Sequence, residues 1–183
     1  GEIAIGAQAL MNSGSSASNN TAVGAMALRS NDNGTGGSAF GFSALRNVNS
    51  GSNNTAFGVN ALLSLTSGAS NTAIGSAAGR NLISGSDNIF IGVGSGASGT
   101  YSNRLYIDNN GGGATPLIYG DFAEDSLVVN GRLTVDGLKN GTGYTFPQSR
   151  GMSGQVLSTD ASGNVSWSSV AGDGNGIYSG SNS

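Results

Sequence analysis

The chain has 183 residues, of which 33 are glycine and 9% are charged, and its formal net charge is −3. This composition supplies too few large apolar side chains for a thick core and too little charge for a disordered polar chain. Histidine and cysteine are both absent, which excludes disulfides, Cys/His metal sites, cysteine nucleophiles and a Ser/His/Asp triad. We therefore expect an ordered chain that has no catalytic residues, no metal and no cofactor.

The sequence also excludes several classes of partner. No apolar run approaches the roughly 20 residues that span a bilayer, and no signal peptide opens the chain, so we expect no membrane insertion. The negative charge and the lack of a basic cluster with interleaved aromatic residues argue against a nucleic-acid partner. The opening GEIAIG already lies inside a repeat, so we expect the sequence to be a fragment of a longer protein.

One short phrase recurs six times before residue 93 and always ends in glycine. The phrases are EIAIG, NTAVG, SAFG, NTAFG, NTAIG and NIFIG, which end at Gly6, Gly24, Gly41, Gly58, Gly75 and Gly92. The first interval is 18 residues and the next four are 17 residues. Such a period predicts one supersecondary unit, here called a rung, stacked on copies of itself. We predict an all-β fibre, built as a repetitive parallel β-roll or β-helix with rungs of about 17 residues.

Each phrase alternates small and large residues, as expected for a strand whose successive side chains point to opposite faces. The residue before the glycine is always large and apolar, and these six residues are here called the apolar ladder: Ile5, Val23, Phe40, Phe57, Ile74 and Ile91. The residue before that is alanine in five phrases and Phe90 in the sixth. We predict that the apolar ladder holds the rungs together and that the alanine face is buried against neighbouring chains.

A second short strand is predicted in each rung, starting three residues after the glycine. It has alanine followed by leucine in the first four rungs, and Ala78 followed by Gly79 in the fifth. Its leucines would form a second apolar ladder, and the Gly/Ser/Asn-rich remainder would form turns. Because a single rung of this kind buries few large side chains, we expect the chain to oligomerise.

Two polar columns follow from the same register. The asparagine column has four members, each four residues before a glycine: Asn20, Asn54, Asn71 and Asn88. Stacking would turn it into a ladder of side-chain amides that stabilises the fibre, with ligand binding as the alternative role. The arginine column lies five residues after the glycine and consists of Arg29, Arg46 and Arg80. It forms either a solvated face that discourages edge aggregation or a possible surface contact for anionic glycans.

The period ends after residue 103. RLYID stays in step with the rungs, so we expect it to cap the stack. LIYGDF and SLVVNGRLTVDGL predict short strands, with a hairpin turn at Asn130-Gly131, and QVLSTD with VSWSSV predicts a second hairpin. We therefore divide the chain into a repeat shaft (1–103), a capping and β-rich transition segment (104–140), and a small hairpin module with a Gly/Ser-rich linker (141–183).

Two further motifs suggest ligand or substrate binding. Gly94, Gly96 and Gly99 fit the dinucleotide-binding pattern GxGxxG, but the sequence after them does not predict the helix that this pattern requires. Asp121, Glu124 and Asp125 supply enough carboxylates for a glycosidase pair. We expect that segment to be a solvated loop, because nothing around it predicts a carbohydrate-binding groove.

The repeat segments NTAIGSAAG and NTAFGVNAL resemble the repeats of tail fibres from bacteriophages and phage-like particles, and are similar to the head repeats of YadA-type trimeric autotransporter adhesins. The resemblance covers residues 1–103 and continues in RLYIDNN, TPLIYGDFAEDSLVVNGRLTV and GMSGQVLSTDASGNVSWSS. It implies an intertwined homotrimer, with three chains per fibre, and a role in attachment. The rungs are longer here than in adhesin heads, which favours the tail-fibre side.

The expected function is therefore a structural and adhesive fibre, as in the tail of a phage or of a contractile injection apparatus. Its expected partners are baseplate or tail proteins and a host cell-surface glycan or protein, and its expected location is extracellular, on a virion tail or an injection particle. The first alternative is an autotransporter-like trimeric adhesin on the bacterial cell surface. The second is a tailspike polysaccharide depolymerase.

Overall fold

The computed structural model describes residues 1–96, 99–109, 115–131, 133–135, 144–145, 152–160 and 165–169. These residues form strands and turns, and no helix capable of crossing a membrane occurs among them. The chain divides into two compact units, Gly1–Asn130 and Gly131–Ser183. The first unit is a β-solenoid of about six rungs, stacked about 17 residues apart. The predicted fold class is confirmed.

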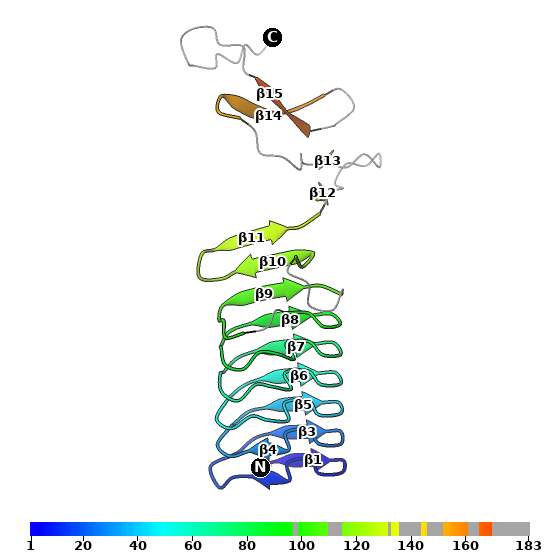
Figure 1. Ribbon diagram of the computed structural model, residues 1–183, viewed down its shortest axis with the longest axis vertical. Helices are drawn as coiled ribbons and strands as arrows, with labels where there is room; N and C mark the ends of the chain where they lie inside the picture. The colour runs from blue at the N-terminus through cyan, green and yellow to red at the C-terminus, as the bar shows by residue number, and fades with distance from the viewer. Residues whose placement is uncertain are drawn as a thin grey trace. The chain divides into compact units, whose positions relative to one another are not determined.

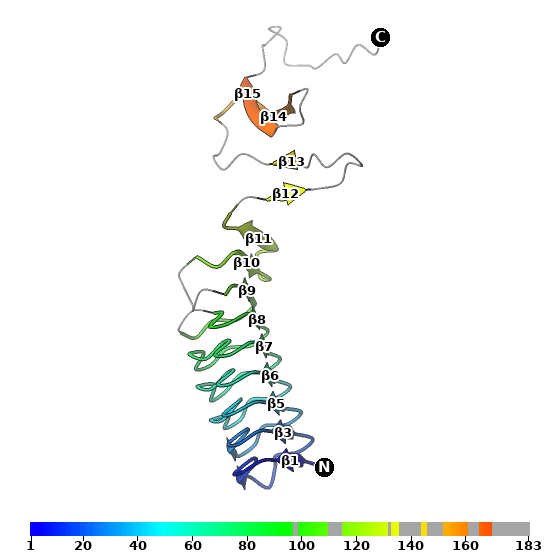
Figure 2. The same ribbon diagram turned by 90° about the vertical axis from the view of Figure 1, so that its right-hand side faces the viewer.

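One sheet runs through the first unit, and each rung adds a parallel strand to it (Figure 1). Its parallel strands are β1 (Ile3–Ile5), β3 (Thr21–Val23), β5 (Ser38–Phe40), β6 (Thr55–Phe57), β7 (Thr72–Ile74), β8 (Ile89–Ile91) and β9 (Arg104–Ile107). Two shorter strands, β2 (Asn12–Ser13) and β4 (Ser30–Asn31), pair in a separate parallel sheet. Figure 2 shows the successive strands stacked one above the next. Equivalent residues of neighbouring rungs are partners, as in Phe40 beside Phe57.

The predicted second strand is wrong, because the Ala-Leu positions belong to turns. Leu28, Leu45 and Leu62 have φ angles of 46°, 50° and 50°, in the left-handed region. The rung must reverse direction within a few residues, and these positive φ angles achieve that while the backbone still bonds to the next rung. The N–H of Leu28, for example, donates to the carbonyl oxygen of Ala44 at 3.0 Å. Backbone groups are thus satisfied between rungs outside the strands as well.

The two faces of the parallel strands are the reverse of the prediction. Ala22, Ala39, Ala56 and Ala73 point into the solenoid and are fully buried. The apolar ladder points outward: Ile5 is 59% exposed, Phe57 58%, Ile74 45% and Ile91 37%, while Val23 and Phe40 are half-buried. The ladder is in register, but it does not form the core, and the alanines are buried within their own chain. The physical reason is the narrow interior, where leucines from the turns leave room only for small residues on the strands.

Two inward-pointing columns fill the interior opposite the alanines. The first is the leucine of the turn, found at Leu10, Leu28, Leu45 and Leu62. The second lies seven residues after the glycine and comprises Val48, Leu65 and Leu82, in segments that the sequence predicted only as turns. Asn31 occupies this second column one rung earlier and is buried with its side chain bonded to the backbone of Gly34.

Phe90 reverses the size relation between strand and turn. Its ring is fully buried at the strand position that alanine holds in the preceding rungs. The turn position that leucine holds earlier is glycine on both sides of the ring, at Gly79 and Gly96. A Cβ added at Gly79 would lie 2.7 Å from Cδ2 of Phe90, and one at Gly96 would lie 2.6 Å from Cδ1. The Gly96 of the GxGxxG pattern is therefore explained by packing against this ring.

Aromatic side chains and an antiparallel hairpin close the C-terminal end of the solenoid. Tyr106 takes the alanine position of β9, and its ring centroid lies 5.8 Å from that of Phe90 and 5.3 Å from that of Tyr119. Beyond it, β10 (Ile118–Asp121) pairs antiparallel with β9, and β11 (Ser126–Val129) pairs antiparallel with β10. The change to antiparallel pairing ends the repeat, because the chain returns along β9 instead of making another circuit.

The hairpin predicted at Asn130-Gly131 is wrong. The strand before it, β11, pairs with β10 through a turn at residues 122–125, while β12 (Thr134–Val135) pairs with β13 (Tyr144–Thr145). The Asn130 side chain instead donates to the carbonyl oxygen of Pro116 at 2.8 Å, which fastens the end of β11 to the start of its own hairpin.

The second predicted hairpin is confirmed. In the second unit, β14 (Gln155–Thr159) pairs antiparallel with β15 (Val165–Ser169), and Leu157 lies opposite Trp167. The predicted turn between these strands and the predicted Gly/Ser-rich linker at the end of the chain lie outside the described residues.

Candidate functional site

The apolar ladder is a continuous outward-facing feature of the first unit. Its members are direct partners from one strand to the next, and the rings of Phe40 and Phe57 stack with centroids 5.7 Å apart. Two residues further along the chain, just past the glycine, Phe42, Val59 and Val93 are also exposed. Apolar surface that is contiguous over several rungs is typical of an interaction site, whereas scattered exposed residues are not.

The asparagine column runs inside the solenoid. Asn54, Asn71 and Asn88 are buried. The amide nitrogen of Asn71 donates to the amide oxygen of Asn54, and that of Asn88 donates to that of Asn71, at 2.9 Å in both steps. Each also donates to a backbone carbonyl of a neighbouring turn, as Asn71 does to Gly85 at 2.8 Å. The backbone N–H of the next rung donates to the same amide oxygen, at 3.0 Å from Asn71 to Asn54. With both ends of each amide bonded inside the chain, the column acts as a structural element.

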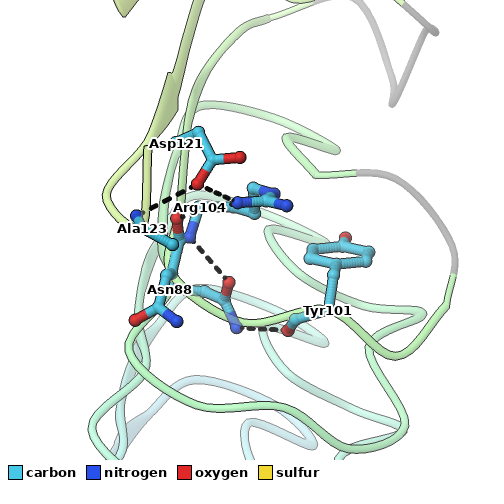
Figure 3. Close-up of polar contacts among 6 residues, drawn as sticks. Asn88, Tyr101, Arg104, Asp121 and Ala123 are labelled. Atoms are coloured by element: carbon cyan, nitrogen blue, oxygen red, sulfur yellow. Dashed lines mark hydrogen bonds and ion pairs between the residues drawn. The ribbon is translucent and has the colours of Figure 1, made fainter. Parts of the chain in front are cut away.

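The asparagine column is interrupted once, by a glycine, and other groups take the place of asparagine at its two ends. Asn20 is separated from Asn54 by Gly37, whose N–H donates to the Asn20 amide oxygen at 2.7 Å. The rung below Asn20 places Glu2 in the column, and its carboxylate accepts a bond from the Asn20 amide at 2.8 Å. At the other end, the backbone N–H of Arg104 donates to the amide oxygen of Asn88 at 3.1 Å (Figure 3).

The six repeat glycines are required by the backbone. Their φ angles lie between 110° and 144°, which side chains rarely adopt. A Cβ at Gly58 would also lie 2.4 Å from the carbonyl oxygen of Gly75, in the rung above. These glycines therefore permit the chain to turn at the end of each strand while adjacent rungs stay hydrogen-bonded, and they are architectural rather than ligand-binding in this arrangement.

The acidic segment after β9 is joined to the cap. Asp121 forms an ion pair with Arg104, and its Oδ1 accepts a hydrogen bond from the N–H of Ala123 at 3.0 Å (Figure 3). Glu124 and Asp125 are exposed in the turn between β10 and β11. All three carboxylates thus belong to one hairpin, and one of them is engaged in fastening that hairpin to β9. No group of three or more His, Cys, Asp or Glu side chains that could hold a metal ion occurs in the described part of the chain.

Two tyrosines of the aromatic cap are shifted in their acidity. Burial raises the pKa of Tyr101 strongly, and the neighbouring Tyr106 adds to this. The pKa of Tyr106 is also raised, mainly by burial and further by Tyr119, with an opposing effect of Arg104. Both shifts follow from packing of the phenol rings against Phe90 and each other, which disfavours the charged phenolate.

The arginine column lies on the outside of the solenoid, on the turn that follows each strand. Arg29 and Arg46 occupy adjacent rungs, Leu63 follows, and Arg80 comes next. The N–H of the residue one rung below donates to the carbonyl oxygen of each arginine, with 2.9 Å at Arg29 and 3.0 Å at Arg46. The three arginines therefore share one register position, as the sequence spacing predicts.

Comparison with protein-family models, with curated proteins and with solved structures found no match to this chain.

Sequence reasoning missed two sets of residues. The buried column of Val48, Leu65 and Leu82 repeats seven residues after the glycine, and the exposed Phe42, Val59 and Val93 repeat one residue after it. Both sets have a sequence signal, namely recurrence of large apolar residues at a fixed offset. That signal is visible only when every position of the 17-residue rung is aligned, including those in Gly/Ser-rich segments.

Proposed function

We propose that this chain is the shaft of an extracellular structural and adhesive fibre, in which three copies associate through their apolar ladders. The observation that carries the proposal is the outward-facing ladder of Ile5, Val23, Phe40, Phe57, Ile74 and Ile91. A repeat that places its largest apolar residues outside, at the same position in every rung, has been built to bury them against another surface. A second and third copy of the same chain supply ladders of identical spacing.

The apolar area of the ladder is large enough to offset much of the cost of association. Burying the exposed half of a large apolar side chain removes about 80–100 Å² from water, worth about 2 kcal/mol at ~25 cal/mol per Å². A ladder of six such residues offers about 12 kcal/mol per chain. This lies within the range of about 4–15 kcal/mol that association costs in lost motional freedom. Adjacent Phe42, Val59 and Val93 add further apolar area at the same end of each strand.

The mechanism of such a fibre is mechanical and multivalent. The continuous hydrogen bonding from rung to rung gives each chain a backbone that resists bending, and three chains present every weak surface site three times. The resemblance of the repeats and their 17-residue length favour a tail fibre of a phage or contractile injection apparatus, attached to baseplate or tail proteins. The alternative is a trimeric cell-surface adhesin, whose shaft would be built in the same way. In either setting, the fibre presents binding to a host-surface glycan or protein.

The oligomeric state tests this proposal directly. Light scattering at micromolar concentration is expected to give three times the chain mass of 17.9 kDa. Phe57→Lys places three charges inside the proposed interface and is expected to reduce the mass toward that of one chain. Ser50→Lys, at an exposed residue of a preceding turn, adds the same charge outside the ladder and is expected to leave the mass unchanged.

Far-UV circular dichroism separates dissociation from unfolding, since the β signal of Phe57→Lys should persist. A single-chain mass for the unmodified protein would refute the trimer. A trimer that survives Phe57→Lys would show that the ladder is not the interface.

A further inference from the structure

The arginine column carries positive charge that the described part of the chain leaves without an acidic partner. The ion pair found among the described residues joins Arg104 to Asp121, in the cap. No described hydrogen bond or ion pair involves the side chains of Arg29, Arg46 or Arg80. In addition, Nε of Arg29 is buried and has no hydrogen-bond partner. The described residues therefore leave the positive charge of all three guanidinium groups without an acidic partner.

The spacing of the column indicates which kind of partner the arginines suit. Neighbouring rungs of a sheet lie about 4.8 Å apart, and Arg29 and Arg46 occupy the same position of adjacent rungs, so two like charges are attached to neighbouring rungs. Such charges repel, and an anion placed between them turns that repulsion into attraction. Arg80 continues the same line two rungs further on, with Leu63 between. The positive charges thus form a line along the stacking direction.

A polar column accompanies the arginines. The next residue in each rung is Ser30, Asn47, Ser64 or Asn81, and none of these is buried. Together with the arginines they occupy the outer surface between two buried columns, the turn leucines on one side and Val48, Leu65 and Leu82 on the other. The hydroxyl groups of Ser30 and Ser64 can bond the hydroxyl groups of a sugar, while the guanidinium groups bind its acidic substituents. The amide oxygen of Asn47 can accept a further bond, since its nitrogen already donates to the carbonyl oxygen of Leu63 at 2.9 Å.

We propose that the arginine column, with the accompanying Ser30, Asn47 and Ser64, binds an acidic polysaccharide that lies along the shaft. The carboxylate or sulfate groups of the polymer pair with the planar guanidinium groups of Arg29, Arg46 and Arg80. A polymer fits better than a single small anion because the charges repeat along the stack. This proposal rests on the adhesive function above and names the class of its ligand.

A polysaccharide fits this surface better than a nucleic acid does. The chain as a whole carries a net charge of −3, which opposes the dense negative charge of a nucleic-acid backbone. Three arginines in line are also few for that partner, and the column contains no aromatic residue on which bases could stack. A polysaccharide with spaced acidic groups matches both the charge and the accompanying hydrogen-bonding residues.

Binding measured by biolayer interferometry on the full chain tests the proposal. The probes are heparin oligosaccharide for sulfate, oligogalacturonate for carboxylate, dextran as a neutral polymer, and single-stranded DNA. We expect binding to at least one acidic oligosaccharide, weakened by salt because exposed charges are screened, and none to dextran. Replacing one arginine by glutamine should weaken binding about two- to fivefold, and replacing all three should weaken it about tenfold or more. The triple Arg→Lys variant should bind less well than the unmodified chain and better than the triple Arg→Gln variant.

A gain-of-function variant provides the sharper test. Leu63→Arg fills the gap between Arg46 and Arg80, and should strengthen binding about two- to fivefold. Asp87→Asn changes the net charge by the same amount at an exposed position with a left-handed backbone that asparagine tolerates, and should leave binding unchanged. Equal effects of these two variants would overturn the column as a site, as would a triple Arg→Gln variant that binds normally or a preference for DNA.

Light scattering on the same samples separates this proposal from the fibre itself. The arginine variants should keep the mass of the unmodified protein, since the column lies apart from the apolar ladder. A trimer that binds none of the acidic probes overturns the polysaccharide site and leaves the fibre standing. A single chain that binds them through the arginines supports the site and refutes the trimer.

Discussion

Substitutions that exchange the large and the small side chain at positions 90 and 79 test most directly how the interior is packed. In the earlier rungs a strand alanine faces a turn leucine, whereas here a strand phenylalanine faces a turn glycine. We predict that each single reversal is damaging and that the double reversal, Phe90→Ala with Gly79→Leu, is much less so. The double variant reproduces the arrangement that the rungs at Leu28, Leu45 and Leu62 already have.

The magnitudes follow from the local geometry. Phe90→Ala leaves a cavity beside Gly79 and Gly96, and a phenylalanine truncation of this kind costs about 3–5 kcal/mol. Gly79→Leu places a Cβ 2.7 Å from both Leu62 Cδ2 and Phe90 Cδ2, so overpacking costs about 1–3 kcal/mol. A left-handed backbone adds about 1–2 kcal/mol for a leucine, since φ at Gly79 is 60°. In the double variant the leucine fills the cavity, and a coupling energy of about 2–3 kcal/mol is expected.

Urea unfolding of the four proteins, followed by circular dichroism, gives this coupling energy. As a control, Phe90→Ala is combined with Leu45→Val, three rungs away, where the two effects should add to within about 0.5 kcal/mol. If Phe90→Ala and Gly79→Leu are simply additive as well, the two positions do not share one packing space. The explanation of Gly79 by the phenylalanine ring would then be wrong.

Three further predictions concern polar groups and the aromatic cap. Gly37→Asn should raise the unfolding midpoint, because the new amide closes the gap in the asparagine column. A Cβ at Gly37 lies 3.0 Å from the Asn20 amide oxygen, so a small shift of that side chain accommodates it. A lower midpoint would contradict this prediction. Asn71→Asp removes the amide donor to Asn54 and Gly85 and buries a charge. It should lower the free energy of unfolding, measured in urea, by about 3 kcal/mol or more. The control Asn53→Asp, at an exposed residue, should change it little. Because the pKa values of Tyr101 and Tyr106 are raised in the folded state, the unfolded chain loses these protons first as the pH rises. The stability of the fold should therefore be full below about pH 10 and fall above it. The double variant Tyr101→Phe with Tyr106→Phe should flatten this fall in unfolding midpoints measured from pH 8 to 12.

The period of the repeat was enough to predict the fold class, because glycines at a constant interval allow only a stack of similar rungs. The position of the asparagine column was predictable for the same reason, since a fixed offset from the glycine becomes a line in space. The strand pairing after the repeat was not predictable from Asn130-Gly131 alone. There the pairing of β10 with β9, fastened by Arg104 and Asp121, decided which strands became neighbours, and such a long-range contact leaves no local signal.

The inside and outside of the strands were reversed for a physical reason. Alternation shows that two faces differ, but it does not show which of them is enclosed. The usual assumption, that large apolar residues lie inside, fails when the enclosed space is supplied with leucines from the turns. Val48, Leu65 and Leu82 complete this second source of core, and because they lie in Gly/Ser-rich segments their contribution was not apparent. The burial of each column depends on the path of the whole rung, and local alternation carries no information on that path.

This reversal bears on how a repeat can serve two requirements with few apolar residues. A core made of alanine from the strand and leucine from the turn closes each chain by itself, with backbone and asparagine bonds linking one rung to the next. The large residues are then not needed inside and remain on the outer face at one position per rung. Had Ile74 and Phe57 been inside, the chain would have had a wider interior but no apolar outer face with which to meet another chain. Placing the alanine inside therefore lets the single chain enclose its own core and leaves its largest apolar side chains on the outer face, where the proposed fibre would bury them between chains.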